Sequence, residues 1–192
     1  MFTALLDTCV LWPSLQRDFL LSLAVEGLYR PIWSAAILDE LECGEERKLV
    51  TRGEKPVEAA RRAQRLICEM RRAFDDAEIA GWEGLDGTYG LPDPDDEHVV
   101  AAAVVGGAGA IITLNLRDFP RPNIPTAIQV LSPRTFAANT VELRPTRALA
   151  AIHAIAARSG RSGQRLTVHD VLDLLADRYG MDQVAELIRP LL

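Results

Sequence analysis

The sequence lacks long hydrophobic runs, a basic N-terminal leader and any regular spacing of cysteines. No apolar stretch in the 192 residues reaches the roughly 18 residues that a membrane-spanning helix needs. Asp7 interrupts the apolar N-terminus, which argues against a secretory signal peptide. The three cysteines are odd in number and scattered, which favours free thiols in a reducing cytoplasm over a disulfide framework. These absences predict a cytoplasmic protein without a membrane segment.

Positive charge is also scarce. The chain has 21 Lys and Arg residues against 27 Asp and Glu residues, so its net charge is −6. This balance argues against a protein that binds nucleic acid over its whole surface. The basic residues nevertheless concentrate between Arg47 and Arg72. That segment is open to two interpretations, a solvated helix face or a ridge that guides phosphates.

Short apolar runs alternate with amphipathic patterns along the first two thirds of the chain. The apolar runs are brief, as buried strands are, and they lie at residues 2–6, 29–33, 110–114 and 128–131. Ser34 is a suitable N-cap for the helix after the second run, and we expect that helix to end near Gly44. Strands that alternate with helices predict an α/β domain with a mainly parallel sheet.

The composition changes near Pro145, after which the pattern is helical only. Residues 146–158 are rich in alanine, and Thr167 is expected to open a further helix. We therefore expect two domains, an α/β domain over residues 1–140 and an all-helical C-terminal appendage over residues 145–192.

Four acidic residues stand where separate elements begin or end. Asp7 follows the first strand, and Asp118 follows the strand at residues 110–114. Open parallel sheets bind ligands at the carboxyl ends of strands, near the point where the strand order reverses, so both residues should reach that edge. Asp96 lies in the first turn of a helix that enters from the same rim. Glu40 is expected to lie on the core-facing stripe of its helix.

Carboxylates that a fold brings together repel one another unless a cation neutralises them, and hard oxygen ligands suit Mg²⁺ or Mn²⁺. The residues alone therefore indicate a metal-dependent enzyme that cleaves phosphodiesters. Each acid also has a structural explanation, because Asp7 could cap the next turn, and Asp93 and Asp95 have the positions of capping and helix-dipole residues. The third acid of the set stays open among Asp93, Asp95 and Asp96.

Four short motifs contain these acids. They are Leu5-Leu6-Asp7-Thr8, Ile37-Leu38-Asp39-Glu40-Leu41, the run from Asp95 to Ala103, and the run from Ile112 to Phe119. Their order and spacing resemble those of PIN-domain ribonucleases, and within that family the chain is most similar to the VapC-type toxins of bacterial toxin–antitoxin pairs. The resemblance covers roughly residues 1–135, about two thirds of the chain.

The resemblance implies a three-layer α/β/α fold and a Mg²⁺- or Mn²⁺-dependent endoribonuclease, often a homodimer that an antitoxin protein inhibits. It implies that the catalytic, metal-binding acids are Asp7, Glu40, Asp96 and Asp118. It further implies that the same edge of the sheet is lined by Thr113 and Asn115. Separately from the resemblance, if the acidic set binds a metal, the basic segment is a candidate phosphate guide, with Arg61, Arg62 and Arg65 as its candidate RNA-binding residues. The helices beyond Pro145 make the chain longer than a minimal toxin of this kind, and the resemblance gives them no role.

Two other classes of function have to be weighed. A phosphoaspartyl-transfer enzyme would also carry a nucleophilic aspartate after its first strand. Enzymes of haloacid-dehalogenase type, however, want a second aspartate where this chain has Cys9, and its only lysines, Lys48 and Lys55, lie far from the predicted strand ends. A nuclease-like scaffold that binds RNA or a protein without turnover is the other alternative, and the intact acids argue against it. The three histidines show no spacing of a triad or zinc site and are interpreted as ordinary helix residues.

Overall fold

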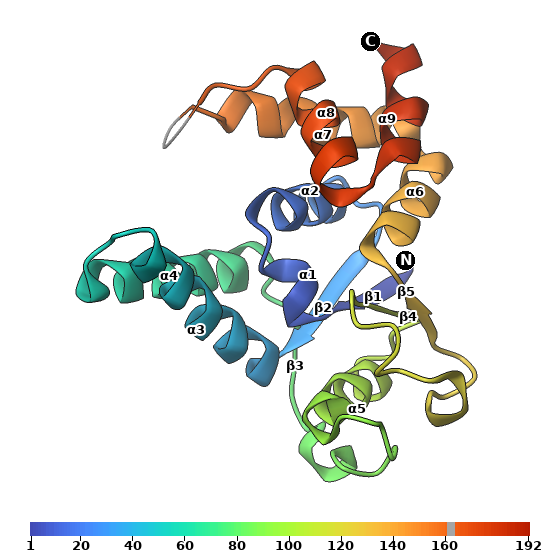
Figure 1. Ribbon diagram of the computed structural model, residues 1–192. Helices are drawn as coiled ribbons and strands as arrows, with labels where there is room; N and C mark the ends of the chain where they lie inside the picture. The colour runs from blue at the N-terminus through green and yellow to red at the C-terminus, as the bar shows by residue number, and fades with distance from the viewer. Residues whose placement is uncertain (161–163) are drawn as a thin grey trace. The chain divides into compact units, whose positions relative to one another are not determined.

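The computed structural model describes residues 1–160 and 164–192 and contains one five-stranded sheet (Figure 1). Its strands are β1 (Thr3–Leu6), β2 (Arg30–Ser34), β3 (Glu78–Ile79), β4 (Ala110–Ile112) and β5 (Gln129–Leu131). Their order in the sheet is β3-β2-β1-β4-β5, with β1 parallel to β4 and β2 parallel to β3. The predicted α/β class with a mainly parallel sheet is confirmed. The short strand β3 was not predicted.

The two central strands are apolar along almost their whole length. Residues 4–6 of β1 and all of β4 are fully buried. Strands covered on both faces read as continuous hydrophobic runs instead of alternating ones, which is why both could be recognised from the sequence.

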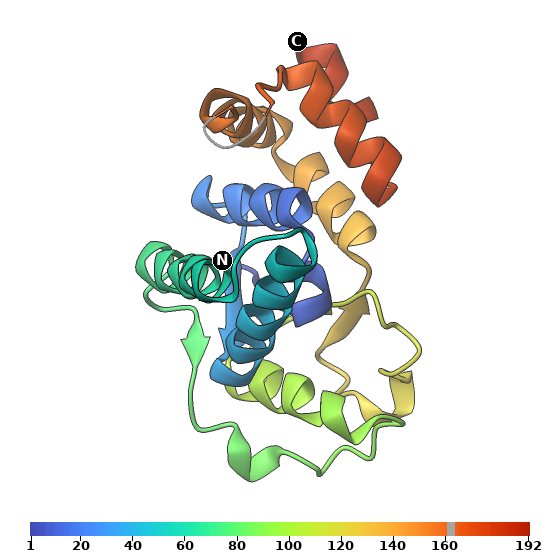
Figure 2. The same cartoon turned by 60° about the vertical axis from the view of Figure 1, so that its left-hand side comes forward.

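Three of the helices make two of the crossings between the strands. They are α3 (Ala35–Thr51), α4 (Pro56–Ala73) and α5 (Glu97–Val105). The pair α3 and α4 connects β2 to β3, whereas α5 carries the chain back across β2 and β1 to β4. These crossings run in opposite directions, so right-handed connections place them on opposite faces of the sheet. Figure 2 shows α3 and α4 side by side, and the predicted three-layer α/β/α arrangement is confirmed.

Helix α3 is longer than the sequence predicted. Its start is capped as expected, because the Ser34 hydroxyl oxygen accepts the backbone N–H three residues on at 3.2 Å. The prediction that it ends near Gly44 was wrong, since the helix continues to Thr51. Buried positions at Glu45 and Leu49 continue the inward-facing stripe beyond the glycine. A lone glycine inside a helix costs only about 1 kcal/mol, which this packing outweighs.

The chain forms two compact units. One contains Thr3–Trp12 and Pro31–Val130, which include the short helix α1 (Thr8–Leu11), and the other contains Met1–Phe2, Pro13–Arg30 and Leu131–Leu192. The second unit therefore differs in composition from the expected C-terminal appendage, because it also takes in helix α2 (Ser14–Val25).

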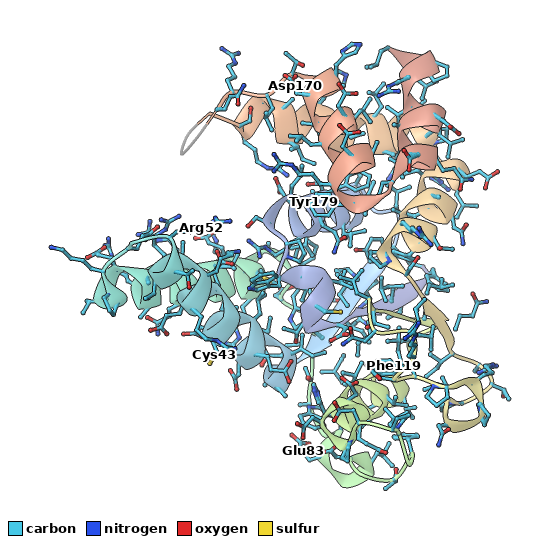
Figure 3. The ribbon with its side chains drawn as sticks, viewed as in Figure 1. Cys43, Arg52, Glu83, Phe119, Asp170 and Tyr179 are labelled. Atoms are coloured by element: carbon cyan, nitrogen blue, oxygen red, sulfur yellow. The ribbon has the colours of Figure 1, made fainter. Side chains whose placement is uncertain are left out.

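The second unit is a group of helices held by buried apolar side chains and a few polar bonds. Besides α2 it contains α6 (Pro133–Leu143), α7 (Pro145–Arg158), α8 (Val168–Tyr179) and α9 (Asp182–Ile188). Arg158 ties α7 to α2 by donating to Asp18 at 2.5 Å and to Ser22 at 2.6 Å. Helix α8 begins, as predicted, at a Thr167 cap, and Figure 3 labels residues near its two ends, Asp170 and Tyr179. Within residues 1–160 and 164–192, no helix is long and apolar enough to span a membrane.

Candidate metal centre

Asp7 lies directly after β1 and is almost completely buried, with 5% of its surface exposed. Its backbone N–H donates to the carbonyl oxygen of Ile112 at 3.1 Å, which holds the carboxyl ends of β1 and β4 side by side. The strand order reverses between these two strands, and open α/β sheets bind their ligands at such a point. Asp7 is therefore positioned where the sequence analysis expected a site.

Two side chains donate hydrogen bonds to one oxygen of the Asp7 carboxylate. Thr113 Oγ1 donates to Oδ2 at 2.6 Å, and Cys9 Sγ donates to the same oxygen at 3.0 Å. Thr113 is fully buried, and its Oγ1 accepts the backbone N–H of Asn115 at 3.0 Å. Among the described residues Oδ1 of Asp7 has no hydrogen-bond partner, so it is the oxygen left to face a cation.

Asp96 ends the 3-10 turn η2 (Pro94–Asp96), directly before α5, and is half-buried. Burial raises its pKa, the negative charges of Asp7, Asp93 and Asp118 raise it further, and His98 partly offsets them, so that the pKa reaches about 6. Charges that influence one another in this way lie close in space. Asp7, Asp93 and Asp118 therefore lie near enough to Asp96 for their charges to act on it.

The neighbouring acids of the Asp93–Asp96 cluster have other surroundings. Asp93 caps η2 as predicted, because its Oδ1 accepts the backbone N–H of Asp95 at 3.0 Å. Both Asp93 and Asp95 are exposed. Of the three candidates for the third acid, Asp96 is the half-buried one that interacts with Asp7 and Asp118, and the geometry favours it.

Asp118 lies in the turn that follows β4. Its backbone N–H donates to the carbonyl oxygen of Asn115 at 2.9 Å, which closes the turn. The next residue, Phe119, is buried and anchors this loop (Figure 3). The Asn115 side chain is exposed and forms no hydrogen bond within the described part of the chain, so it lines the edge without holding any of the acids.

Glu40 differs from the expectation that it shares the core-facing stripe of its helix. Half of its side chain is exposed, and it is held by two partners. Thr8 Oγ1 donates to Oε2 of Glu40 at 2.5 Å, and His98 Nε2 lies 3.2 Å from Oε1. Burial raises the pKa of Glu40, but the hydrogen bonds from His98 and Thr8 outweigh it, so the pKa is lowered.

His98 therefore belongs to the site, although it was interpreted as an ordinary helix residue. Burial lowers its pKa, but the hydrogen bond with Glu40 and the charges of Glu40, Asp7 and Asp86 outweigh burial, so the pKa is raised. The lowered pKa of Glu40 and the raised pKa of His98 both favour an ion pair between these two residues beside the three aspartates. No spacing in the sequence links the two residues, so it carried no signal for this pair.

The donor set fits a hard divalent ion by its chemistry. The converging groups are carboxylates, and their mutual repulsion, visible at Asp96, is what a cation would relieve. In the described ranges no three His, Cys, Asp or Glu side chains already stand close enough to hold one ion together. Binding would therefore require the acidic side chains to close up, and Glu40 to exchange His98 for the ion.

The arginines expected to guide RNA lie on the exposed face of α4. Arg61 pairs with Glu58 at 2.5 Å, and Arg62 pairs with Glu54. Arg65 is exposed and forms no ion pair with the described residues. No contact between these arginines and the acidic site is found in the part of the chain that the structure describes.

A family model described as a PIN domain matches residues 3–117. The matched span begins with β1, includes Asp7, Glu40 and Asp96, and ends one residue before Asp118. Comparisons with curated proteins and with solved structures give no match.

Proposed function

Because the chain belongs to the PIN-domain family over more than half of its length, we propose that it is a metal-dependent endoribonuclease and the toxin of a toxin–antitoxin pair. PIN domains are generally nucleases and typically use divalent metal ions. The observation that carries the proposal is the place of Asp96 beside other acids: burial raises its pKa, and the charges of Asp7, Asp93 and Asp118 raise it further, to about 6. A fold that needed only stability would not gather three carboxylates at a sheet edge.

The proposed ligands of Mg²⁺ or Mn²⁺ are Asp7, Asp96 and Asp118, with Glu40 at the rim. When bound there, a divalent ion would lower the pKa of a water that attacks the phosphodiester and would neutralise charge on the leaving oxygen. Thr113 and Cys9 fix the Asp7 carboxylate through Oδ2, and Oδ1 would be the oxygen that binds the ion. Thr8 holds Glu40 at the edge by its hydroxyl.

The proposed partners are an RNA substrate, a cognate antitoxin protein and a second copy of the chain. They rest on the resemblance of the four acidic motifs to VapC-type toxins. The three cysteines are free, which supports the proposal of a reducing cytoplasm.

Two alternative functions are less well supported than a nuclease. A catalytically silent module that binds RNA or a protein is favoured by the ion pair of Glu40 with His98, which occupies one of the four acids. A phosphoaspartyl phosphatase is less well supported, because Cys9 donates to the carboxylate that would be the nucleophile. In addition, Lys48 is engaged by Glu45 instead of standing free beside a phosphate.

Cleavage of total cellular RNA tests the proposal. Wild-type protein with Mg²⁺ or Mn²⁺ should give discrete fragments, and EDTA, Asp7→Asn or Asp96→Asn should abolish them. Asp177→Asn, which removes an exposed acid from α8, is the matched control and should cleave as wild type does. Absence of cleavage in wild-type protein that still binds Mn²⁺ in a calorimetric titration would favour the silent module.

The proposed role of the arginines on α4 has its own test. Arg61→Glu combined with Arg65→Glu should weaken RNA binding, because it replaces two positive charges by negative ones, and should leave Mn²⁺ affinity intact. Unchanged RNA affinity would mean that these arginines form a solvated helix face and do not guide RNA.

A further inference from the structure

A surface hollow of about 440 Å³ lies between the end of α1 and helix α3. It is lined by Trp12, Gly44, Arg47, Lys48, Thr51 and Arg52. Among these described residues are one aromatic and three basic side chains and no acid. In a chain with a net charge of −6, a concave patch of this composition needs an explanation.

Trp12 is held in a fixed position although 45% of its surface is exposed. A Cβ atom at Gly44 would come within 3.1 Å of Cδ1 of the indole, so the absence of a side chain at Gly44 lets the ring lie close against α3. Lys48 Nζ lies 5.4 Å from the ring centroid and donates to the Trp12 carbonyl oxygen at 3.3 Å. The ring is thus an exposed aromatic surface whose orientation is already set, so little side-chain freedom is lost on binding.

The charges that remain at the hollow belong to its arginines. Lys48 pairs with Glu45, so its charge is largely neutralised. Among the described residues the Arg47 side chain makes one hydrogen bond, from Nε to the carbonyl oxygen of Cys43 at 3.3 Å. Arg52, at the C-cap of α3, is exposed and has no ion-pair partner among the described residues (Figure 3). Arg47 and Arg52 therefore line the hollow together with Trp12.

The hollow and the candidate metal centre share the same two helices. Thr8 of α1 contacts Glu40 of α3, and one turn further along each helix Trp12 contacts Gly44. Lys48, on the same face of α3, is about 12 Å from Glu40 along the helix axis at 1.5 Å per residue. A strand that entered the acidic centre along this face would reach the hollow next.

We propose that this hollow binds an unpaired nucleotide of a single-stranded RNA whose neighbouring phosphodiester lies at the metal centre. Trp12 would stack on the base, and Arg47 and Arg52 would contact phosphates. The inference rests on the proposed nuclease function and specifies its substrate as single-stranded. Aromatic stacking combined with cationic side chains is how single strands are bound without sequence preference. A protein partner would fit less well, because Trp12 is the only large apolar side chain in the lining.

Binding of a fluorescein-labelled oligouridylate in EDTA, measured by anisotropy, tests this proposal in the full-length chain. Trp12→Ala should weaken binding about tenfold or more, because stacking on an aromatic side chain contributes that much per base, whereas Trp12→Phe should retain most of it. Arg52→Ala should weaken binding and reduce its salt dependence. Arg178→Ala, which removes an exposed charge from α8, is the matched control and should bind as wild type does.

The duplex of the same oligouridylate with oligoadenylate separates stacking from a general loss of structure. Wild-type protein should prefer the single strand, and Trp12→Ala should lose that preference while retaining its thermal unfolding midpoint. Equal affinity of wild type and Trp12→Ala for the single strand would overturn the proposal. If wild type cleaves RNA with Mn²⁺ and Trp12→Ala cleaves and binds equally well, only this inference fails. If binding depends on Trp12 but nothing is cleaved, the hollow is confirmed as a site for single-stranded RNA and the nuclease function fails.

Discussion

The hydroxyl of Thr113 donates a 2.6 Å hydrogen bond to Oδ2 of Asp7, and both side chains are buried. Each residue directly follows its strand, and the parallel register pairs Leu6 of β1 with Ile112 of β4, so the two side chains meet at the edge of the sheet. A hydrogen bond to a carboxylate is short and strong because the acceptor is charged. The orientation of the proposed metal ligand is therefore set by strand register and does not rely on a mobile loop.

Removal of the Thr113 hydroxyl should disturb Asp7 directly. Thr113→Val keeps the shape of the side chain but leaves a buried carboxylate without its closest donor, so we expect a loss of about 1–3 kcal/mol in the free energy of unfolding. Mn²⁺ affinity should also fall, because the carboxylate is no longer held in one orientation. Urea denaturation and calorimetric titration measure the two effects.

Two variants serve as controls for Thr113→Val. Thr113→Ser keeps the hydroxyl and should retain most Mn²⁺ affinity. Thr140→Val removes a buried hydroxyl that donates to the carbonyl oxygen of Phe136 within α6, and should leave Mn²⁺ affinity unchanged. Wild-type Mn²⁺ affinity in Thr113→Val would show that Thr113 does not position Asp7.

Crowding of the aspartates should make the metal-free protein sensitive to pH. Burial and the charges of Asp7, Asp93 and Asp118 raise the pKa of Asp96 from 3.8 to about 6. A carboxyl group whose pKa is higher in the folded than in the unfolded state binds its proton more tightly when folded. Its contribution to stability is thus lost as the pH rises through about 6.

In EDTA at about pH 7.5, Asp96→Asn should therefore be more stable than wild type, by about 1 kcal/mol after allowance for solvent screening of a half-buried group. The difference should shrink as the pH approaches about 4, where Asp96 of the wild type is protonated. Thermal unfolding across this range measures it, with Asp177→Asn as a control that should show no such trend. A pH-independent difference would mean that neither burial nor the neighbouring charges raise the pKa of Asp96. Wild-type Mn²⁺ affinity should decline below about pH 6, because protons then compete for Asp96.

Glu97 stands beside Asp96 in the chain but has a structural role. It is 3% exposed, and its two oxygens accept the backbone N–H groups of Tyr89 and Leu91, each at 2.7 Å. Burial raises its pKa, but the backbone donors outweigh burial and the pKa is lowered. Its contribution to stability is therefore present above the unfolded pKa and is lost as the pH falls through the lower folded value.

Glu97→Gln should lower the free energy of unfolding by about 1–2 kcal/mol, because an amide offers one acceptor oxygen where the carboxylate offers two. Hydrogen exchange should accelerate at the amides of Tyr89 and Leu91. Glu83→Gln, at an exposed acid on the same connection, should change neither (Figure 3). Unchanged exchange at both amides would rule out Glu97 as the anchor of this loop.

Strands and edge residues could be predicted because local pattern determines them. Residues 4–6 and 110–112 are buried on both faces and so form continuous apolar runs, and residues that follow parallel strands necessarily meet at one edge. That logic predicted the placement of Asp7 and Asp118. It failed for the two-residue β3, which has no hydrophobic run of its own.

Tertiary contacts account for what the sequence could not reveal. Glu40 contacts His98, and Asp7 contacts Cys9. Neither His98 nor Cys9 has a sequence spacing that identifies it as a residue of the site. Helix α6 was missed among the prolines of residues 120–133, although its start has a recognisable cap, since Ser132 accepts the N–H of Thr135. Gly44 was taken for a helix end because its contact with Trp12 could not be seen in the sequence.

The three cysteines should differ sharply in reactivity. Cys43 and Cys68 are exposed, whereas Cys9 is half-buried beside Asp7. Burial, the negative charge of Asp7 and the hydrogen bond to it raise the pKa of Cys9 to about 12. Because the thiolate is the reactive form, Cys9 should react with an aromatic disulfide reagent far more slowly than the other two at about pH 8.

Replacement of the exposed cysteines by serine leaves Cys9 as the only thiol and makes its rate measurable. Asp7→Asn in that background should accelerate labelling, because it removes both the charge and the carboxylate acceptor that favour the neutral thiol. Asp118→Asn removes a carboxylate from the same site that makes no contact with Cys9 in the described residues, and it should leave the rate unchanged. Equal rates in all three proteins would show that Cys9 is protected by burial alone. An acceleration confined to Asp7→Asn would establish in solution that the Asp7 carboxylate holds the Cys9 thiol in its neutral form.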